Sequence, residues 1–280
     1  MSESVLYVVA TPIGNLEDMT PRAQRILESV ALIAAEDTRH SGRLLAHFSI
    51  KTPMIAVHDH NERQQQQKII EILAKGDDVA LISDAGTPLI SDPGFILVRE
   101  VREAGFRVVP VPGCCAMITA LSAAGIPSDR FAFEGFPPAK PQQRLNYFSG
   151  LAQESRTLLF YESPHRIIDS LKAVVEVFGA ERPVAIAREL TKTFETFLNG
   201  SAAEVLEKVE SDPNQRKGEF VLMIQGAPEK DDSALDARAE EVLDILLEEL
   251  SVKQASALAA KITGVKKKVL YQAALDRKQD

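Results

Sequence analysis

Short apolar runs alternate with amphipathic stretches along the first 125 residues of the chain. Residues 6–10 are all apolar or aromatic, as expected for a strand buried on both faces of a parallel sheet. Thr20 and Pro21 supply an N-cap and a first-turn proline, which predict a helix through about residue 30. Further strands are predicted at 32–35, 54–57, 79–82 and 107–111, and further helices at 61–74, 94–103 and 115–124. The alternation predicts an α/β lobe with a mostly parallel sheet over residues 1–125.

A stretch of glycine, proline and aromatic residues at 126–138 interrupts this pattern and predicts a hinge. A second α/β lobe is predicted over residues 139–227. Its helices are expected at 142–151, at 164–178 and from Ser201 onward, and its strands at 157–161, 183–187, 193–198 and 219–225. The strand at 193–198 is expected to form a hairpin with the strand before it. Residues 227–233 are typical of a linker, and a helical module is predicted over residues 234–280.

The composition is that of an ordinary globular protein without a membrane segment. No apolar run approaches the roughly 18 residues that span a bilayer, and residues 1–4 lack the basic start of a signal peptide. The two cysteines, Cys114 and Cys115, are adjacent, so a disulfide between them would be strained and would close almost no loop. These features predict a protein of the reducing cytoplasm.

The net charge of −8 argues against a nucleic-acid partner, but the charge is unevenly distributed. Nine acidic and two basic residues lie between positions 229 and 250, whereas seven basic and two acidic residues lie between 251 and 280. A tail polarised in this way indicates a dedicated module. An exposed helical tail of mixed charge is the alternative interpretation.

The basic end of the chain matches a helix-turn-helix arrangement. A helix over 251–262 is predicted to turn its apolar residues inward, followed by a turn at Gly264 and a second helix. The inward residues expected on the two helices are Val252, Ala255, Leu258, Ala259, Ile262, Val265, Val269, Leu270 and Ala273. Lys266, Lys267 and Lys268 fall in the first turn of the second helix, where they oppose the helix dipole. A phosphate ligand would favour that placement, so these lysines are predicted to contact RNA.

Three loops that follow predicted strands of the first lobe combine proline with glycine: 11–16, 83–94 and 111–116. Ligands bind at the carboxyl ends of strands in open α/β sheets, and glycine lets backbone approach a ligand closely. The G-x-G-x-x-G and Walker A patterns do not occur, which points away from NAD and ATP. Asp84 suits the cationic or amino end of a ligand, although Asp84 and Asp92 also suit the capping of turns.

These loops and five further segments resemble the tetrapyrrole methylase superfamily. Within it they resemble the bacterial enzymes that methylate the 2′-hydroxyl of a cytidine in small-subunit ribosomal RNA. The matching segments occur in family order at 11–16, 34–40, 58–62, 83–94, 111–116, 160–166, 187–192 and 217–220. The resemblance implies a two-lobed fold with S-adenosylmethionine in the cleft between the lobes, small-subunit (16S) ribosomal RNA as substrate, and a homodimer.

The resemblance also implies cofactor contacts in both lobes. They fall on Pro12, Asp84, Ala85, Gly86, Thr87, Ile90, Cys115 and Ala116 of the first lobe and on Glu162 and Leu190 of the second. Many relatives have a serine or threonine where Cys114 and Cys115 stand. A backbone contact would survive that difference, whereas a specific hydroxyl contact would not.

Methyl transfer to a ribose hydroxyl requires alignment of the oxygen with the methyl group. A general base, or a cation that stabilises the developing alkoxide, would assist it. The catalytic candidates are Glu162, Arg166, Arg188, Glu189 and Lys192, with His165, Lys217 and Glu219 nearby in sequence. Ion pairs that stabilise the second lobe are the alternative role for each of them.

On the first lobe, Arg39 and His58 are predicted RNA contacts, together with Asp37 and His60. His58 and His60 share one face of a predicted strand, but no further ligands accompany them, so no metal is expected. Two other functions stay open: carbon methylation of a tetrapyrrole, and ligand sensing by a nucleic-acid-binding protein. The basic C-terminal module favours an RNA or sensor function over a tetrapyrrole enzyme. The charged residues at strand ends of the second lobe favour the RNA methyltransferase over the sensor.

Overall fold

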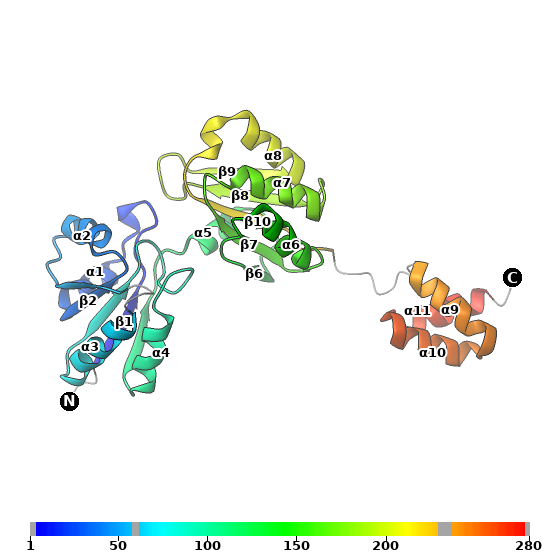
Figure 1. The fold of residues 1–280 in the computed structure, drawn as a ribbon, viewed down its shortest axis with the longest axis horizontal. Helices are drawn as coiled ribbons and strands as arrows, with labels where there is room; N and C mark the ends of the chain where they lie inside the picture. Colours follow the sequence, from blue (N-terminus) through cyan, green and yellow to red (C-terminus); the bar gives the residue numbers. More distant parts are fainter. Residues whose placement is uncertain (1–3, 58–61, 229–236, 278–280) are drawn as a thin grey trace. The chain divides into compact units, whose positions relative to one another are not determined.

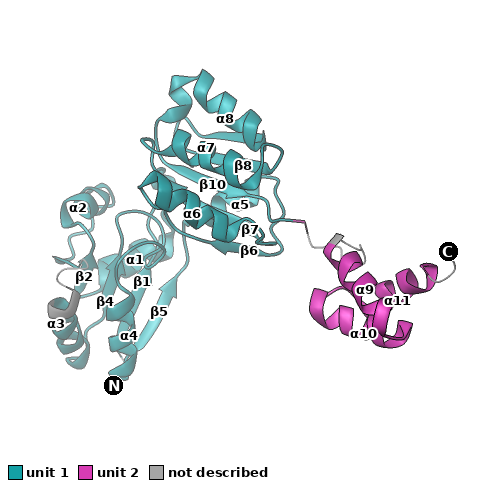
Figure 2. Ribbon diagram, turned by 45° about the vertical axis from the view of Figure 1, so that its right-hand side comes forward, with its two compact units in different colours: residues 1–227 teal, residues 228–280 magenta. Residues whose placement is uncertain are grey.

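The computed structural model describes residues 4–57, 62–228 and 237–277, which fall into two compact units (Figure 2). Unit 1 is Met1–Ala227 and unit 2 is Pro228–Asp280. Unit 1 contains two five-stranded sheets, and the described part of unit 2 is helical (Figure 1). His58, a predicted RNA contact, and His60 lie outside the described residues, as does the predicted linker beyond Pro228.

The first sheet is parallel throughout, with strand order β3-β2-β4-β1-β5. Its strands are β1 (Val5–Val9), β2 (Leu32–Ala35), β3 (Met54–Ala56), β4 (Val79–Ile82) and β5 (Arg107–Val111). The helices in this part of the chain are α1 (Pro21–Ser29), α2 (Thr38–His47), α3 (Glu62–Ala74), α4 (Phe95–Glu103) and α5 (Ala116–Ala123), with a 3-10 turn η1 (Leu16–Asp18). The predicted parallel sheet is confirmed, and its strands end within one residue of their predicted positions.

Helices cover both faces of the first sheet. Ala23 and Leu27 of α1 and Leu45 of α2 pack on one face, whereas α3 and α4 pack on the other. Both faces are therefore apolar, which explains why these strands are continuous hydrophobic runs in the sequence. Thr20 caps α1 as predicted, because its Oγ1 accepts a hydrogen bond from the amide of Ala23 at 3.1 Å.

Helix α2 was not predicted from the sequence, and its composition explains why. It contains Gly42, a poor helix former, and its only buried residues are Ser41 and Leu45. Its start is nevertheless marked, since the Asp37 side chain accepts a hydrogen bond from the amide of Arg39 at 2.8 Å.

The second sheet is mixed, with strand order β6-β7-β10-β8-β9. Its strands are β6 (Phe131–Phe133), β7 (Thr157–Glu162), β8 (Pro183–Arg188), β9 (Thr196–Ser201) and β10 (Phe220–Ile224). Only the β6–β7 pair is parallel. Strand β6 lies inside the segment predicted as a hinge. Strands β8 and β9 form the predicted antiparallel hairpin, in which Arg188 pairs with Thr196. Strand β9 begins at Thr196, three residues later than the predicted start at 193.

The two faces of the second sheet have different coverings. One face packs against α6 (Pro141–Leu151), α7 (Ile167–Phe178) and α8 (Ala202–Ser211) around a core that includes Phe148 and Phe160. The short 3-10 turn η2 (Pro213–Arg216) follows α8. On the other face, Ala120, Leu121 and Ala124 of α5 and its C-terminal end pack on the sheet. Helix α5 therefore follows a strand of the first sheet but packs on the second.

Unit 2 contains α9 (Ala237–Glu249), α10 (Val252–Thr263) and α11 (Lys267–Asp276). Its core includes Leu243, Ala255, Ala259 and Leu270, so α10 presents small side chains to its neighbours. The prediction that Leu258 and Ile262 point inward is wrong, because they are 41% and 51% exposed. The alanine stripe lets the helices approach closely, and this narrow contact leaves the longer side chains outside. Lys266 is the N-cap of α11, and Lys267 and Lys268 begin its first turn.

Candidate active site

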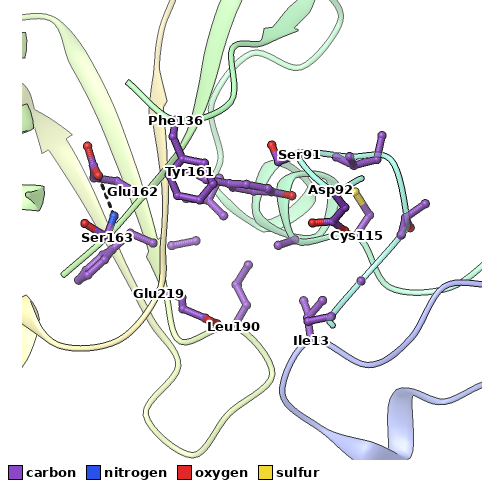
Figure 3. Close-up of a pocket in the computed structure, with 18 of the residues that line it drawn as sticks. Ile13, Ser91, Asp92, Cys115, Phe136, Tyr161, Glu162, Ser163, Leu190 and Glu219 are labelled. Carbon is purple, nitrogen blue, oxygen red and sulfur yellow. Dashed lines mark hydrogen bonds between the residues drawn. The ribbon is translucent and has the colours of Figure 1, made fainter. Parts of the chain in front are cut away.

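A cavity of about 370 Å³ lies where loops of the first sheet meet the uncovered part of the second sheet (Figure 3). Its size falls within the range of roughly 300–1,000 Å³ that small-molecule sites occupy. The first-sheet side contributes Ile13, Ala85, Gly86, Thr87, Ile90, Ser91, Asp92, Cys115 and Ala116. The other side contributes Phe136, Tyr161, Glu162, Ser163, Pro164, Ala187, Leu190, Glu219, Phe220 and Val221. All three loops singled out in the sequence reach this cavity.

One row of cross-strand neighbours forms the second-sheet wall of the cavity. Val221 of β10 pairs with Tyr161 of β7 on one side and with Ala187 of β8 on the other. Because side chains alternate between the faces of a strand, this row shares a face with Leu159 and Met223, which pack against α5. Helix α5 covers that face of the sheet only in part, and the cavity lies beside it.

Backbone contacts hold the loops of the first sheet together. Thr11 and Gly86 form an isolated antiparallel bridge, in which the two amides donate to the opposite carbonyls at 2.8 and 3.0 Å. The Thr87 hydroxyl donates to the Cys114 carbonyl at 2.8 Å, which links the second loop to the third. Gly86 has a φ of 83°, and a Cβ there would lie 3.3 Å from Cγ2 of Ile13. A side chain at this position would therefore be strained and would crowd the cavity wall.

Backbone strain is concentrated around the cavity. Among the described residues, positive φ angles at non-glycine positions occur at Leu89, Ser91, Glu189 and Thr191, and at Ser49 elsewhere. Leu89 and Ser91 lie in the Asp84–Gly94 loop, and Glu189 and Thr191 flank Leu190 of the cavity wall. Such conformations are costly and persist where the surrounding structure imposes them, frequently at functional sites.

Polar groups on one side of the cavity are partly buried. The Tyr161 hydroxyl accepts a hydrogen bond from the amide of Met117 at 3.3 Å, and its ring projects toward Asp92 and Cys115 (Figure 3). Burial, together with the nearby Cys115, raises the pKa of Tyr161 to about 12, so its hydroxyl keeps its proton at neutral pH. Burial also raises the pKa of Asp92, and the nearby Asp84 adds to this, against a hydrogen bond from Ser83.

Glu162 is buried at the other end of the cavity with several partners. Its carboxylate accepts a hydrogen bond from the Ser170 hydroxyl at 2.5 Å. It also accepts one from the Ser163 amide at 2.7 Å (Figure 3). Arg166 lies 3.1 Å from the same carboxylate, at the N-cap of α7. The predicted helix start at Pro164 is therefore three residues too early, because residues 164–166 form a turn that brings Arg166 back to Glu162.

A second charged cluster lies at the edge of the cavity next to Leu190. The Lys192 ammonium lies 2.8 Å from carboxylate oxygens of both Glu189 and Glu219. Burial opposes ionisation of Glu189, but the hydrogen bonds from Lys192 and from the Glu219 amide outweigh it and lower the pKa. Burial likewise opposes the charge of Lys192, but its bonds to Glu189 and Glu219 outweigh it and raise the pKa. Both ions are therefore charged at neutral pH.

The other predicted catalytic residue, Arg188, is buried beneath this cluster and is not among the cavity-lining residues. Its guanidinium donates to the carbonyls of Lys217 and Phe194 at 3.1 and 2.9 Å and to the Thr196 hydroxyl at 3.2 Å. These bonds hold the loop between β8 and β9 in place. Arg188 thus lies where it supports the backbone of Glu189 to Thr196.

The structure brings most of the predicted cofactor contacts to one cavity. Ala85, Gly86, Thr87, Ile90, Cys115, Ala116, Glu162 and Leu190 line it, whereas Pro12 and Asp84 line a second, adjoining cavity. Arg39 is exposed on α2 and pairs with Asp37 at 2.9 Å. Sequence reasoning did not select Tyr161, Asp92 or Phe136. Two of them could have been found from the sequence. Alternation along β7 places Tyr161 on the same face as Leu159, and Asp92 lies within the 83–94 loop.

Two features are absent among the described residues: a metal-binding cluster and a membrane-spanning helix. No group of three or more His, Cys, Asp or Glu side chains in the described ranges is arranged to hold a metal ion. No helix in these ranges is long and apolar enough to cross a bilayer.

This architecture has clear relatives. Residues 5–206 match the family described as Tetrapyrrole (Corrin/Porphyrin) Methylases, and residues 233–278 match the RsmI C-terminal HTH domain. The first match covers well over half of the chain, which belongs to the tetrapyrrole methylase family and is a methyltransferase.

Relatives of high identity match along the full chain. A protein of Pseudomonas aeruginosa named Ribosomal RNA small subunit methyltransferase I is 58% identical over 99% of each chain. A protein of the same name from Escherichia coli O157:H7 is 54% identical over 99% of this chain and 96% of its own. Among solved structures, uroporphyrin-III-C-methyltransferase from Thermus thermophilus has a TM-score of 0.55 at 22% identity and covers 79% of this chain and 94% of its own. At that identity the likeness shows the fold alone.

Proposed function

We propose that the protein transfers the methyl group of S-adenosylmethionine to the 2′-hydroxyl of a cytidine in small-subunit (16S) ribosomal RNA. The observation that carries this proposal is the similarity over 99% of both chains to a relative named Ribosomal RNA small subunit methyltransferase I. The proposal includes a cytoplasmic homodimer acting on the small ribosomal subunit. It also includes the division into lobes 1–125 and 139–227, a hinge at 126–138 and an RNA-binding module at 234–280.

The residues of the larger cavity fit the cofactor. Because Gly86 has no side chain, the space beside Ile13 at the cavity wall stays open for a ligand. Tyr161 and Phe136 offer aromatic surfaces. The carboxylates of Asp92 and Glu162 border the same space and suit a cationic ligand. Pro12 and Asp84 belong to the same loops but line the adjoining second cavity. When bound, the cofactor supplies a methyl group on a positively charged sulfur, which an oxygen nucleophile can attack.

The chain's own residues must hold the ribose and accept the proton of its hydroxyl. Glu189 is a weak base, because Lys192 and the Glu219 amide stabilise its charged form. Lys192 is cationic and is suited to stabilise developing negative charge on the ribose oxygen. Asp92 lines the cavity, and its raised pKa makes it a stronger base than an exposed aspartate. We assign the base role to Asp92 and the electrostatic role to Lys192 with Glu189.

Glu162 and Arg166 have a different part in this proposal. The carboxylate oxygens of Glu162 are already engaged by Arg166, the Ser170 hydroxyl and the Ser163 amide. Its charge instead fixes the Ser163–Arg166 turn that forms one end of the cavity. Arg166 and Arg188 are positioning residues, since each holds a loop that borders the cavity.

The C-terminal module supports RNA as the substrate over a tetrapyrrole. Lys266, Lys267 and Lys268 are exposed at the start of α11, where the helix dipole disfavours cations. An RNA phosphate at this helix end would offset that cost. A porphyrin substrate has no use for such a basic module.

A single labelling experiment tests the proposal. The full chain is incubated with radiolabelled S-adenosylmethionine and with naked ribosomal RNA, isolated small subunits or a tetrapyrrole. We expect label in the small-subunit RNA, resistant to alkaline cleavage at one cytidine because its 2′-oxygen is blocked. Label in the tetrapyrrole, or in a base of the RNA, would overturn the assignment.

A further inference from the structure

A second cavity of about 250 Å³ adjoins the first. It shares two of the first cavity's three loops, 11–16 and 83–94. It is lined by Pro12, Gly14, Leu16, His40, Arg43, Leu44 and Asp84. Ile13 and Ala85, which are next to Pro12 and Asp84 in sequence, line the first cavity instead. The two loops joined by the Thr11–Gly86 bridge therefore contribute residues to both cavities. A group in the second cavity is one backbone layer away from the proposed cofactor site.

The basic side chains of this cavity, Arg43 and His40, are available to a ligand. Arg43 and His40 are exposed on α2, and neither forms an ion pair or side-chain hydrogen bond with another residue that the structure describes. Arg39, one turn earlier, is by contrast bound through two nitrogens to the carboxylate of Asp37. An unpaired arginine fork at the edge of a pocket matches the geometry of a phosphate.

The opposite element supplies a fixed acceptor. One carboxylate oxygen of Asp84, Oδ1, accepts the amide hydrogen of Asp37 at 3.1 Å, which anchors the side chain between β4 and α2. A carboxylate on a pocket wall accepts a hydrogen bond from an exocyclic amino group, such as N4 of cytosine. Pro12, Leu16 and Leu44 add apolar surface. The lining therefore combines donors for a phosphate, an acceptor for the amino group of a base and apolar side chains against which a base can pack.

We propose that the second cavity binds a nucleotide that flanks the methylated cytidine, with Arg43 and His40 on its phosphate and Asp84 on the amino group of its base. The proposal rests on the proposed function, because it takes RNA as the substrate. It assigns the cavity to an amino-bearing base, which excludes uracil.

The test measures binding of fluorescently labelled oligo(C) and oligo(U) RNA to the full chain by anisotropy over a salt series. Arg43→Gln should weaken binding of oligo(C) about tenfold and reduce the salt slope by about 0.7, the value of one single-strand phosphate contact. The matched control is Arg102→Gln, on α4 at the opposite face of the same sheet, where a charge is lost without touching the cavity. It should change binding less than twofold.

Asp84→Asn tests the base contact. The variant keeps the oxygen that accepts the Asp37 amide, but its side-chain NH₂ can donate to O4 of uracil. The preference for oligo(C) over oligo(U) should therefore fall at least threefold. Thermal unfolding and calorimetric binding of S-adenosylmethionine by the Arg43 variant should match the wild type, which shows that the first cavity is intact.

The outcomes separate this proposal from the proposed function. Equal losses in the Arg43 and Arg102 variants overturn the phosphate contact, and an unchanged base preference in the Asp84 variant overturns the base contact. Methylation of small subunits by wild-type protein together with unimpaired RNA binding by the Arg43 variant would reject the second cavity alone. Arg43-dependent RNA binding without any RNA methylation would reject the proposed function and leave the nucleotide site standing.

Discussion

Gly14, in the loop after β1, lies directly against Lys192, in the loop after β8. A Cβ at position 14 would come within 2.5 Å of Cγ of Lys192 and 3.0 Å of the Thr191 hydroxyl oxygen. The same Lys192 bonds to Glu189 and Glu219 at the edge of the cavity. The absence of a side chain at one position therefore lets loops of the two sheets close together and places the ammonium group beside the cavity.

Gly14→Ala should displace Lys192 from its two carboxylate partners. We expect the methylation rate to fall about 10- to 100-fold, because small displacements of a positioned charge are costly to catalysis. Overpacking should also lower stability by about 1–3 kcal/mol. Steady-state kinetics and thermal unfolding measure both effects. Gly150→Ala, on α6 with no atom within 4 Å of the added Cβ, is the control and should preserve the rate. A fully active Gly14 variant would separate this contact from catalysis.

Gly86→Val should abolish binding of S-adenosylmethionine, because its side chain would crowd Ile13 at the cavity wall. Gly105→Val is a matched control, because the φ of Gly105 is 86° and that of Gly86 is 83°. An added Cβ at Gly105, however, would have no atom within 4 Å. Both variants bear a similar backbone strain of roughly 1–2 kcal/mol, so their melting temperatures should fall together. Calorimetry should find binding only in the Gly105 variant. Wild-type affinity in both would remove this loop from the cofactor site.

Asp92→Asn should stabilise the protein at pH 7 and slow methylation. Burial raises the pKa of Asp92 above its ordinary value of 3.8, so the folded state disfavours the carboxylate. The folded protein therefore loses stability as pH rises through the interval between 3.8 and the raised pKa, and a neutral asparagine avoids that loss.

Melting temperatures across a pH series measure this difference. The gain of the asparagine variant should shrink as the pH falls through the raised pKa and should vanish below 3.8, where the acid is protonated in both states. Asp129→Asn, at an exposed position, is the control for loss of a carboxylate away from the cavity. A variant that is stabilised at pH 7 but methylates at the wild-type rate would rule Asp92 out as the base.

Replacement of Lys266, Lys267 and Lys268 by glutamine should weaken RNA binding and reduce its salt slope by up to about three phosphate contacts. Thermal stability should be equal or slightly higher, because three cations no longer oppose the dipole of α11. Cofactor affinity should not change. The double variant of Lys253 and Lys261, both exposed on α10, controls for loss of charge in the same unit. An unchanged salt slope in the triple variant would make the module a packing or dimerisation element.

The sequence by itself determined the strands of the first lobe and the three loops that reach the cavity. Its parallel strands are apolar on both faces, so β1, β2 and β4 stand out as continuous runs between helix signals. The loops at 11–16, 83–94 and 111–116 follow from the same pattern, because ligand loops come after parallel strands. Helix α2 could not be predicted from its sequence, since it buries only Ser41 and Leu45 and contains a glycine.

Only the tertiary structure decided which side chains share the cavity and which roles they can take. Val221 meets Tyr161 and Ala187 through strand register, a non-local relation between three segments that no local pattern encodes. Burial raises the pKa of Asp92, whereas ion pairing lowers the pKa of Glu189, although both are acids in candidate loops. Residue type alone also failed to predict exposure at two positions. Arg188 is charged but lies buried beneath a loop, whereas Leu258 is apolar but exposed. Solvent exposure and electrostatic partners depend on packing between distant segments, and that packing exists only in the folded chain.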